Sequence, residues 1–249
     1  MKNKIILLLV FLVTTITFSQ KKTKNYIPEG FRILEQIVIN PDNEEYNQNI
    51  SFHYDKRGKI LKITNHSKLF SYEEIYEYKK NRISRISYVN SDPRLNQITT
   101  LNYKNGKLSE MIVERVNKDE NKSKNTFIKT GSIEYIYTND NIEKIHKDLN
   151  GIQTSLKEII FLDEEGNFIS FSTSNKRIPA KEYDDKNNPR DLVYKKYLMG
   201  YTLYGTGNVL KEWGNIKNEY KYNEHQFPIE KKKFKDGELN TVTTYIYSK

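Results

Sequence analysis

The chain of 249 residues contains no cysteine. This absence excludes a disulfide framework, so strand pairing and side-chain packing alone must stabilise the fold. It also excludes a lipid anchor attached to a cysteine thiol. Other residues with special chemistry are scarce, since the chain has one tryptophan, three methionines and four histidines.

Sequence patterns for catalysis or metal binding are also missing. The histidines are His53, His66, His146 and His225, and no two of them have the local spacing of metal ligands. No nucleophile elbow, phosphate-binding loop, EF-hand loop or dinucleotide fingerprint is present. We therefore expect no metal, no cofactor and no enzymatic activity. A secreted hydrolase whose acidic residues meet only in three dimensions remains the alternative.

Long hydrophobic runs are limited to one, Ile5–Val13, which is shorter than the ~20 residues that span a bilayer. Lys2 and Lys4 precede this run, and the small residues Thr17 and Ser19 follow it. This order is typical of a cleaved secretory signal peptide. The sequence thus predicts a signal peptide over residues 1–19 and a periplasmic or extracellular location, without lipidation.

The net charge is +9, and it is spread over many segments of mixed charge. Solubility explains such a pattern, and attraction to an anionic surface of the cell envelope is the other interpretation. We expect no nucleic-acid partner. An integral outer-membrane barrel is a weaker alternative, because the mean hydropathy is −0.80 and charges interrupt strands such as Arg82–Ile86.

What the chain does contain is tyrosine, 19 in all, in a repeated unit. An aromatic or aliphatic anchor precedes a polar turn, and an apolar residue follows the turn. Successive anchors lie mostly 19 to 25 residues apart. They are Tyr54, Tyr78, Tyr103, Tyr137, Leu162, Tyr183, Leu203, Tyr222 and Tyr247.

The turn residues explain why each unit reverses the chain. Aspartate accepts backbone N–H bonds within a turn, and glycine tolerates a positive φ. The predicted turn residues are Asp55, Gly58, Gly106, Asp163, Gly166 and Gly207. Each unit is therefore predicted to be a β-hairpin.

Isolated hairpins are marginal in water, so the units are expected to pair into one sheet. Nine hairpins make about 16 strands, and a sheet this wide curls because twist accumulates. We predict an all-β fold of antiparallel, Tyr-anchored hairpin repeats in a curled or barrel-like sheet. It forms a single domain over residues 31–249, after a flexible segment at 20–30, and a long polar loop covers 117–130.

The unit Tyr54-Asp55-x-x-Gly58-x-Ile60-x-x-Ile63 resembles the YD repeat of RHS-type bacterial surface proteins. The chain is also similar to a domain-of-unknown-function family of Gram-negative envelope proteins with a porin-like fold. Three segments carry this similarity: Tyr183 to Pro189, Gly207-Asn208-Val209, and Tyr220-x-Tyr222-Asn223 ending in Phe227-Pro228. The resemblance implies a barrel-like antiparallel fold and an envelope location, and it implies no activity.

Tyrosines that recur at one place in every unit are best explained as a structural ladder. Aromatic residues outside that register are better candidates for a ligand site. They are Tyr194, Tyr197, Tyr201, Tyr204 and Trp213. The sequence thus favours a non-catalytic envelope module that binds a glycan, a lipid headgroup or a protein partner, and it indicates no oligomeric state.

Overall fold

The protein is one curled antiparallel sheet, as predicted. The computed structural model describes residues 28–117, 126–138, 141–162, 168–173, 176–179, 182–184, 186–194 and 210–248. Within these ranges, 17 strands belong to a single sheet. The strands are β1 (Ile33–Ile39), β2 (Gln48–Tyr54), β3 (Ile60–Ser67), β4 (Tyr72–Lys79), β5 (Arg82–Asn90), β6 (Gln97–Lys104), β7 (Lys107–Asn117), β8 (Thr126–Tyr137), β9 (Asn141–Lys147), β10 (Gln153–Leu162), β11 (Phe168–Thr173), β12 (Lys176–Pro179), β13 (Glu182–Tyr183), β14 (Leu210–Trp213), β15 (Ile216–Tyr222), β16 (Pro228–Lys235) and β17 (Glu238–Tyr247).

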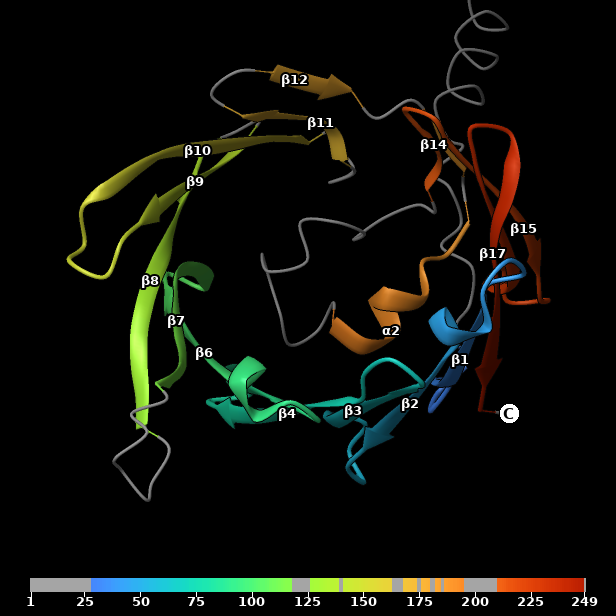
Figure 1. The fold of residues 1–249 in the computed structure, drawn as a ribbon, viewed down its shortest axis with the longest axis horizontal. Helices are drawn as coiled ribbons and strands as arrows, with labels where there is room; N and C mark the ends of the chain where they lie inside the picture. Colours follow the sequence, from blue (N-terminus) through green and yellow to red (C-terminus); the bar gives the residue numbers. More distant parts are fainter. Residues whose placement is uncertain are drawn as a thin grey trace, which may run out of the picture.

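Neighbours in sequence are neighbours in the sheet. Each strand pairs antiparallel with the next from β1 to β12 and again from β13 to β17. The last strand, β17, pairs with β1, where Gln36 lies opposite Tyr245. No ladder joins β12 to β13 in the described ranges, so the sheet curls into a ring that does not close (Figure 1).

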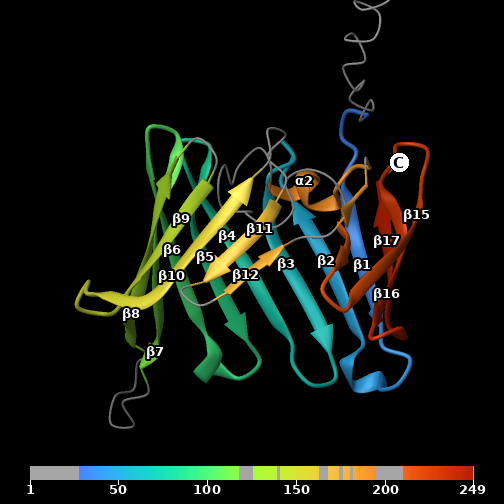
Figure 2. The same ribbon diagram turned by 90° about the horizontal axis from the view of Figure 1, so that it is seen from above.

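Three short helices accompany the sheet. The 3-10 turns η1 (Glu44–Tyr46) and η2 (Pro93–Leu95) lie at one end of the ring, and α2 (Pro189–Tyr194) lies inside it towards the other end (Figures 1 and 2). The helix α2 was not predicted, because six residues are too few to show a helical period. Below, the end with η1 and η2 is called the η end, and the other is called the turn end.

The hydrophobic core lines the inner face of the ring. Successive residues of a strand point to opposite faces, so one residue in two faces inwards. Val193 of α2 packs in the same cluster as the strand residues. The buried members of this cluster are Ile33, Ile60, Ile63, Tyr76, Ile83, Ile86, Leu101, Leu108, Tyr135, Ile142, Ile160 and Val193.

The tyrosine anchors connect one hairpin to the hairpin before it. The hydroxyl of Tyr54 donates to the carbonyl of Ile33 at 2.9 Å, and that of Tyr103 donates to the carbonyl of Ile83 at 2.8 Å. Tyr247 likewise donates to the carbonyl of Pro228 at 2.7 Å. Each of these three rings thus packs on the core while its hydroxyl donates to a backbone carbonyl.

A cation covers four of these rings. The charged group lies 5.0 to 5.4 Å from the ring centroid, within the range of a cation–π interaction. The pairs are Arg32 over Tyr54, Lys59 over Tyr78, Arg82 over Tyr103 and Lys107 over Tyr137.

The turn at Asp55 has the geometry that its sequence indicates. The Oδ1 atom of Asp55 accepts from the backbone N–H groups of Arg57 and Lys59, each at 2.8 Å. The bond from Lys59 is the main reason that the pKa of Asp55 lies below its ordinary value. Gly58 has a φ of 81°, and in the shorter turn Gly106 has a φ of 85°.

Two further turns of this kind carry the same hydrogen bonds. Asp148 accepts from the N–H groups of Asn150 and Ile152, and Asn223 accepts from those of His225 and Phe227. Of the other predicted anchors and turn residues, Asp163, Gly166, Leu203 and Gly207 lie outside the described residues. Leu162 ends β10 and Tyr183 ends β13, but the description does not extend to their side chains.

Two predicted boundaries are wrong. The predicted polar loop 117–130 contains strand residues, because β7 continues to Asn117 and β8 begins opposite it at Thr126. Phe127, Ile128 and Thr130 favour extended backbone even where all three are exposed. At the N-terminus, the predicted flexible segment 20–30 extends too far, since Ser248 donates from its hydroxyl to the carbonyl of Gly30.

Candidate functional site

The inner face of the sheet is apolar near the turn end of the strands and polar near their η end. Every second residue of β4 points to this face, and these residues are Tyr72, Glu74, Tyr76 and Tyr78. Tyr76 and Tyr78 belong to the apolar turn end of the ring, whereas Tyr72 lies towards the η end among amide side chains. The η-end half of the inner face is therefore the polar half, and we consider it the candidate site.

On β3 to β6 this half carries a surface of two aromatic rings and three amides. We call Asn65, Tyr72, Tyr88, Asn90 and Gln97 the aromatic–amide surface. The sheet register brings them together, since Tyr72 lies opposite both Asn65 and Asn90, and Tyr88 lies opposite Gln97. The rings of Tyr72 and Tyr88 are stacked, with centroids 4.8 Å apart at an interplanar angle of 30°.

Local contacts hold this surface in place. Asn90 Nδ2 lies 3.3 Å from the Tyr88 hydroxyl, and Asn65 Nδ2 donates to Gln48 Oε1 at 3.2 Å. Burial, and after it the charge of Glu74, raises the pKa of Tyr72. Tyr72 is therefore a neutral hydrogen-bonding group at any physiological pH.

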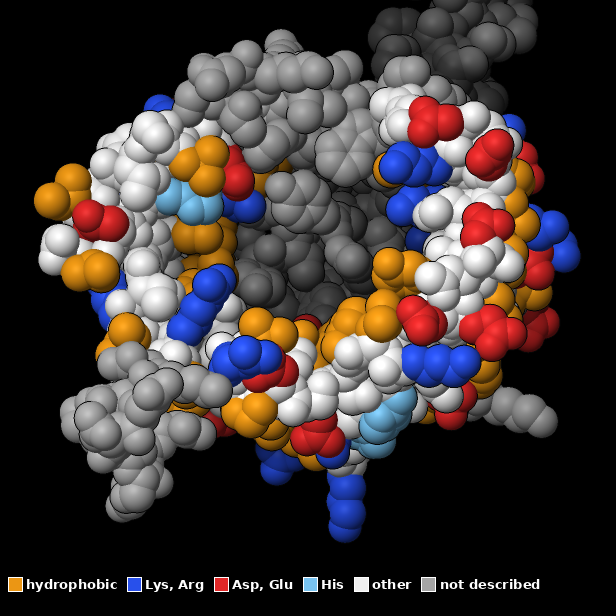
Figure 3. Space-filling model, viewed as in Figure 1, with side chains coloured by type: hydrophobic (Ala, Val, Ile, Leu, Met, Phe, Trp, Pro, Cys, Tyr) orange, Lys and Arg blue, Asp and Glu red, His pale blue; other side chains and the backbone are white. Residues whose placement is uncertain are grey.

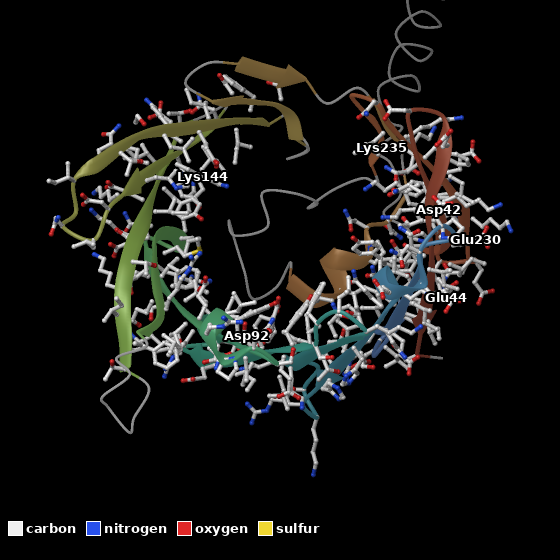
Figure 4. The ribbon with its side chains drawn as sticks, viewed as in Figure 1. Asp42, Glu44, Asp92, Lys144, Glu230 and Lys235 are labelled. Carbon is white, nitrogen blue, oxygen red and sulfur yellow. The ribbon has the colours of Figure 1, made fainter. Side chains whose placement is uncertain are left out.

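A second feature of the inner face is a row of three lysines on β16. We call Lys231, Lys233 and Lys235 the basic strip. Lys231 lies opposite Thr243, which alternates with Tyr245 and Tyr247 of the inner face. Figure 3 shows Lys and Arg side chains gathered along this wall of the ring, and Figure 4 shows Lys235 on it.

A charged group on β9 and β10 faces inwards on the far wall. Lys144 Nζ lies 3.1 Å from Glu158 Oε2, and His146 Nε2 lies 3.6 Å from Glu158 Oε1. Figure 4 shows Lys144 on the inner side of this wall. These side chains are largely buried, and the carboxylate pairs with the lysine. The Lys144–Glu158 ion pair therefore stabilises this wall of the sheet. The negative charge of Glu158 is balanced by the positive charge of Lys144.

The predicted ligand residues fall largely outside this description. Tyr197, Tyr201 and Tyr204 lie outside the described residues. Tyr194 ends α2 and Trp213 ends β14, and for both only the backbone is described. The backbone of β14 pairs with β15, the strand next to the basic strip, with Trp213 opposite Ile216.

Three carboxylates of the described inner face have a partner. Glu74 accepts from the Tyr76 hydroxyl, Glu158 pairs with Lys144, and Asp184 accepts from the Tyr222 hydroxyl. In the described part of the chain, no three His, Asp or Glu side chains form a group that could hold a metal ion. No helix in the described ranges is long and apolar enough to cross a membrane.

Porin-like proteins are among the solved structures that match this chain. A porin-like protein from Bacteroides vulgatus matches with a TM-score of 0.52 at 12% sequence identity, over 87% of this chain and 98% of that chain. The fold is porin-like. A porin-like protein from Bacteroides uniformis matches with a TM-score of 0.41 at 11% identity, over 91% of this chain and 100% of that chain.

At 12% identity, the match to the Bacteroides vulgatus protein concerns the fold alone. No family model matches the sequence, and no curated protein matches it either. The porin-like architecture implied by the resemblance is therefore confirmed, and the relation to YD-repeat proteins stays a prediction.

The sequence analysis did not single out the aromatic–amide surface or the basic strip. The sequence does contain a pattern that predicts the basic strip, because the lysines at positions 231, 233 and 235 are two residues apart and so lie on one face of a strand. A signal for Tyr72 and Tyr88 is weaker, since each lies away from the anchor of its unit and only the register brings them together.

Proposed function

We propose that this chain is an exported, non-catalytic protein of the bacterial envelope that binds a glycan on the inner face of its curled sheet. The observation that supports this most is the aromatic–amide surface. Tyr72 and Tyr88 stack there, with the side chains of Asn65, Asn90 and Gln97 around them. Export rests on the signal-like residues 1–19.

The chemistry of sugars matches this combination. A pyranose presents an apolar face of C–H groups and an edge of hydroxyls. An aromatic ring packs against the face, and planar amides donate to and accept from the hydroxyls. Since Tyr72 stays neutral, its hydroxyl can serve in either role.

The aromatic–amide surface needs no rearrangement to bind, because it is built on strands. The backbone positions of Tyr72 and Tyr88 are set by ladders on both sides, and Asn90 pairs with Tyr72 on one side. Rigid placement lowers the entropy cost of binding. Three of the described inward-facing acids, Glu74, Glu158 and Asp184, have partners, and this arrangement favours binding over hydrolysis.

The test is a calorimetric titration of the exported chain with soluble peptidoglycan fragments and with neutral and acidic oligosaccharides. We expect one class to bind and Tyr88→Ala to weaken that binding by about tenfold or more, which is a loss of roughly 1.4 kcal/mol. Tyr46→Ala is the matched control, since Tyr46 is an exposed tyrosine of η1.

The outcomes separate cleanly. Binding that survives in Tyr46→Ala and is lost in Tyr88→Ala, with both variants melting cooperatively, supports the proposal. No binding to any glycan overturns it, as does equal weakening in the two variants. Turnover of a bound glycan into shorter products would favour the hydrolase alternative.

A further inference from the structure

The turn end of the ring carries a concentration of positive charge between β2 and β7. Three turns lie side by side there, and they join β2 to β3, β4 to β5 and β6 to β7 (Figure 2). Their exposed cationic side chains are called the basic rim below. The members of the basic rim are Lys56, Arg57, Lys79, Lys80, Lys104 and Lys107.

Acidic side chains do not neutralise this charge. The acid within the three turns is Asp55, and its Oδ1 atom is engaged by two backbone N–H groups. Lysines on the walls of the ring are paired, since Lys62 Nζ lies 2.8 Å from Glu73 Oε1 and Lys221 Nζ lies 2.9 Å from Glu230 Oε1. Among the described residues, no side chain of the basic rim takes part in an ion pair.

The spacing of the turns lets their charges act together. Successive turns at this end are two strands apart, and at ~4.8 Å per strand this separation is about 10 Å. The Debye length is also about 10 Å at ~0.1 M salt. The potentials of neighbouring turns therefore overlap, and the half-buried Lys59 and Arg82 of the same turns add to them.

The backbone at Lys80 is a second, independent observation. Lys80 has a φ of 48°, and Asn105 holds the equivalent position of the next turn with a φ of 49°. Asparagine and glycine adopt this left-handed conformation more readily than lysine does. The β4–β5 turn thus carries a lysine at its tip where asparagine would be less strained. Turn stability does not explain this lysine, whereas a need for charge at the tip does.

We propose that the basic rim docks on the anionic headgroups of a lipid bilayer, with its Lys and Arg side chains binding the lipid phosphates. Clusters of about four to eight Lys or Arg residues attract anionic lipid surfaces in this way. The three turns are exposed at one end of the ring, so they can contact one surface together. The aromatic–amide surface lies towards the η end and then faces away from the bilayer.

The composition of the rim favours lipid over other partners. Protein interfaces are depleted in lysine and enriched in aromatic residues, whereas the exposed side chains of the rim are cationic. Sugars and nucleic-acid bases pack on open aromatic faces. The rings behind the rim are already engaged, since Tyr78 and Tyr137 pack on the core and lie beneath Lys59 and Lys107. A phosphate headgroup needs no aromatic partner and no cleft.

The experiment measures co-sedimentation of the exported chain with lipid vesicles. One set of vesicles is phosphatidylcholine, and the other also contains phosphatidylglycerol. The rim variant is Lys79→Gln/Lys80→Asn/Lys104→Gln, with asparagine at position 80 because it tolerates the positive φ. The control variant, Lys68→Gln/Lys217→Gln/Lys221→Gln, removes the same charge from exposed lysines that are paired with acids. Thermal melts verify that both variants fold.

We expect the unmodified chain to bind the vesicles with phosphatidylglycerol, and to bind them less at high salt. The rim variant should lose about tenfold or more in its partition coefficient, since each Lys or Arg near an anionic surface contributes about fivefold. The control variant should change much less, because its substituted lysines lie outside the three turns.

Other results overturn the proposal. Absence of vesicle binding does so, and so does equal binding to phosphatidylcholine alone, which would show that headgroup charge is irrelevant. Equal weakening of the two variants would show that net charge acts without the rim. Binding of inorganic polyphosphate through the rim, without vesicle binding, would replace the lipid by a soluble anion. The vesicles contain no sugar, so these outcomes are independent of the glycan binding proposed above.

Discussion

The hydroxyl of Tyr78 donates a hydrogen bond to the carbonyl of Ile60 at 2.7 Å, and Lys59 lies over the same tyrosine ring. Two adjacent residues of one hairpin thus bind one residue of the next. The same pattern recurs where Arg32 and Ile33 meet Tyr54, and where Arg82 and Ile83 meet Tyr103. The tyrosine repeat is therefore a connection between hairpins along the ring.

Removing the hydroxyl of one anchor tests this connection. Tyr78→Phe keeps the ring in the core and deletes the bond to Ile60, so we expect it to lower the free energy of unfolding by about 0.5–1.5 kcal/mol. Urea unfolding measures the change. Tyr46→Phe is the control, because Tyr46 is exposed, and equal stability of the two variants would show that the bond contributes nothing.

Two turn glycines with the same φ allow the stability effects of two alanine substitutions to be compared. Gly58 and Gly151 both have a φ of 81°. A Cβ on Gly58 would lie 2.8 Å from the Arg32 guanidinium, whereas a Cβ on Gly151 would meet nothing within 4 Å. Both alanine variants should lose about 1–2 kcal/mol from the positive φ.

Gly58→Ala should lose more than Gly151→Ala, because Arg32 must also move from its place over Tyr54. Thermal melts of the two variants, measured side by side, give the difference. A larger loss for Gly151→Ala would contradict the role given to Arg32.

The Asp55 turn predicts a specific acid sensitivity. Backbone hydrogen bonds, chiefly the one from Lys59, lower the pKa of Asp55 below its ordinary value of 3.8. A carboxyl with a lowered pKa in the folded state contributes stability above the unfolded pKa, and this stability is lost as the pH falls through the folded pKa. The unmodified protein should therefore lose this contribution below pH 3.8.

Asp55→Asn removes the titrating group and keeps an acceptor, as Asn223 does in its own turn. Between about pH 4.5 and about pH 2.5, its melting temperature should fall less than that of the unmodified protein. Melting curves across this range test the prediction. Parallel pH profiles for the two proteins would show that Asp55 does not contribute.

The fold was predictable because its information is local. Asp55 and Gly58 specify a turn within five residues of the chain, and an anchor such as Tyr54 marks the strand before it. Hairpins that pair in sequence order need no long-range rule. Local sequence signals did not predict the helix α2, because it is too short to show a helical period. They did not predict the strand ends at Asn117 and Thr126 either, because these residues are polar.

The candidate site was less predictable because it depends on register. Shifting a strand by one residue moves every side chain to the other face. Lys231 and Lys232 are adjacent and chemically equal, yet Lys231 lies opposite Tyr220 on the inner face, while Lys232 lies opposite Glu219, a residue of the outer face. The sequence alone does not distinguish them.

Hydroxyl-radical footprinting with a saturating concentration of the oligosaccharide that binds in the calorimetric titration tests the central claim most directly, since it shows where the ligand lies. If the inner face binds the glycan, oxidation of Tyr72 and Tyr88 falls on binding while that of the exposed Tyr46 is unchanged. Protection of Tyr46 alone, or unchanged oxidation of all three tyrosines, would contradict binding inside the ring.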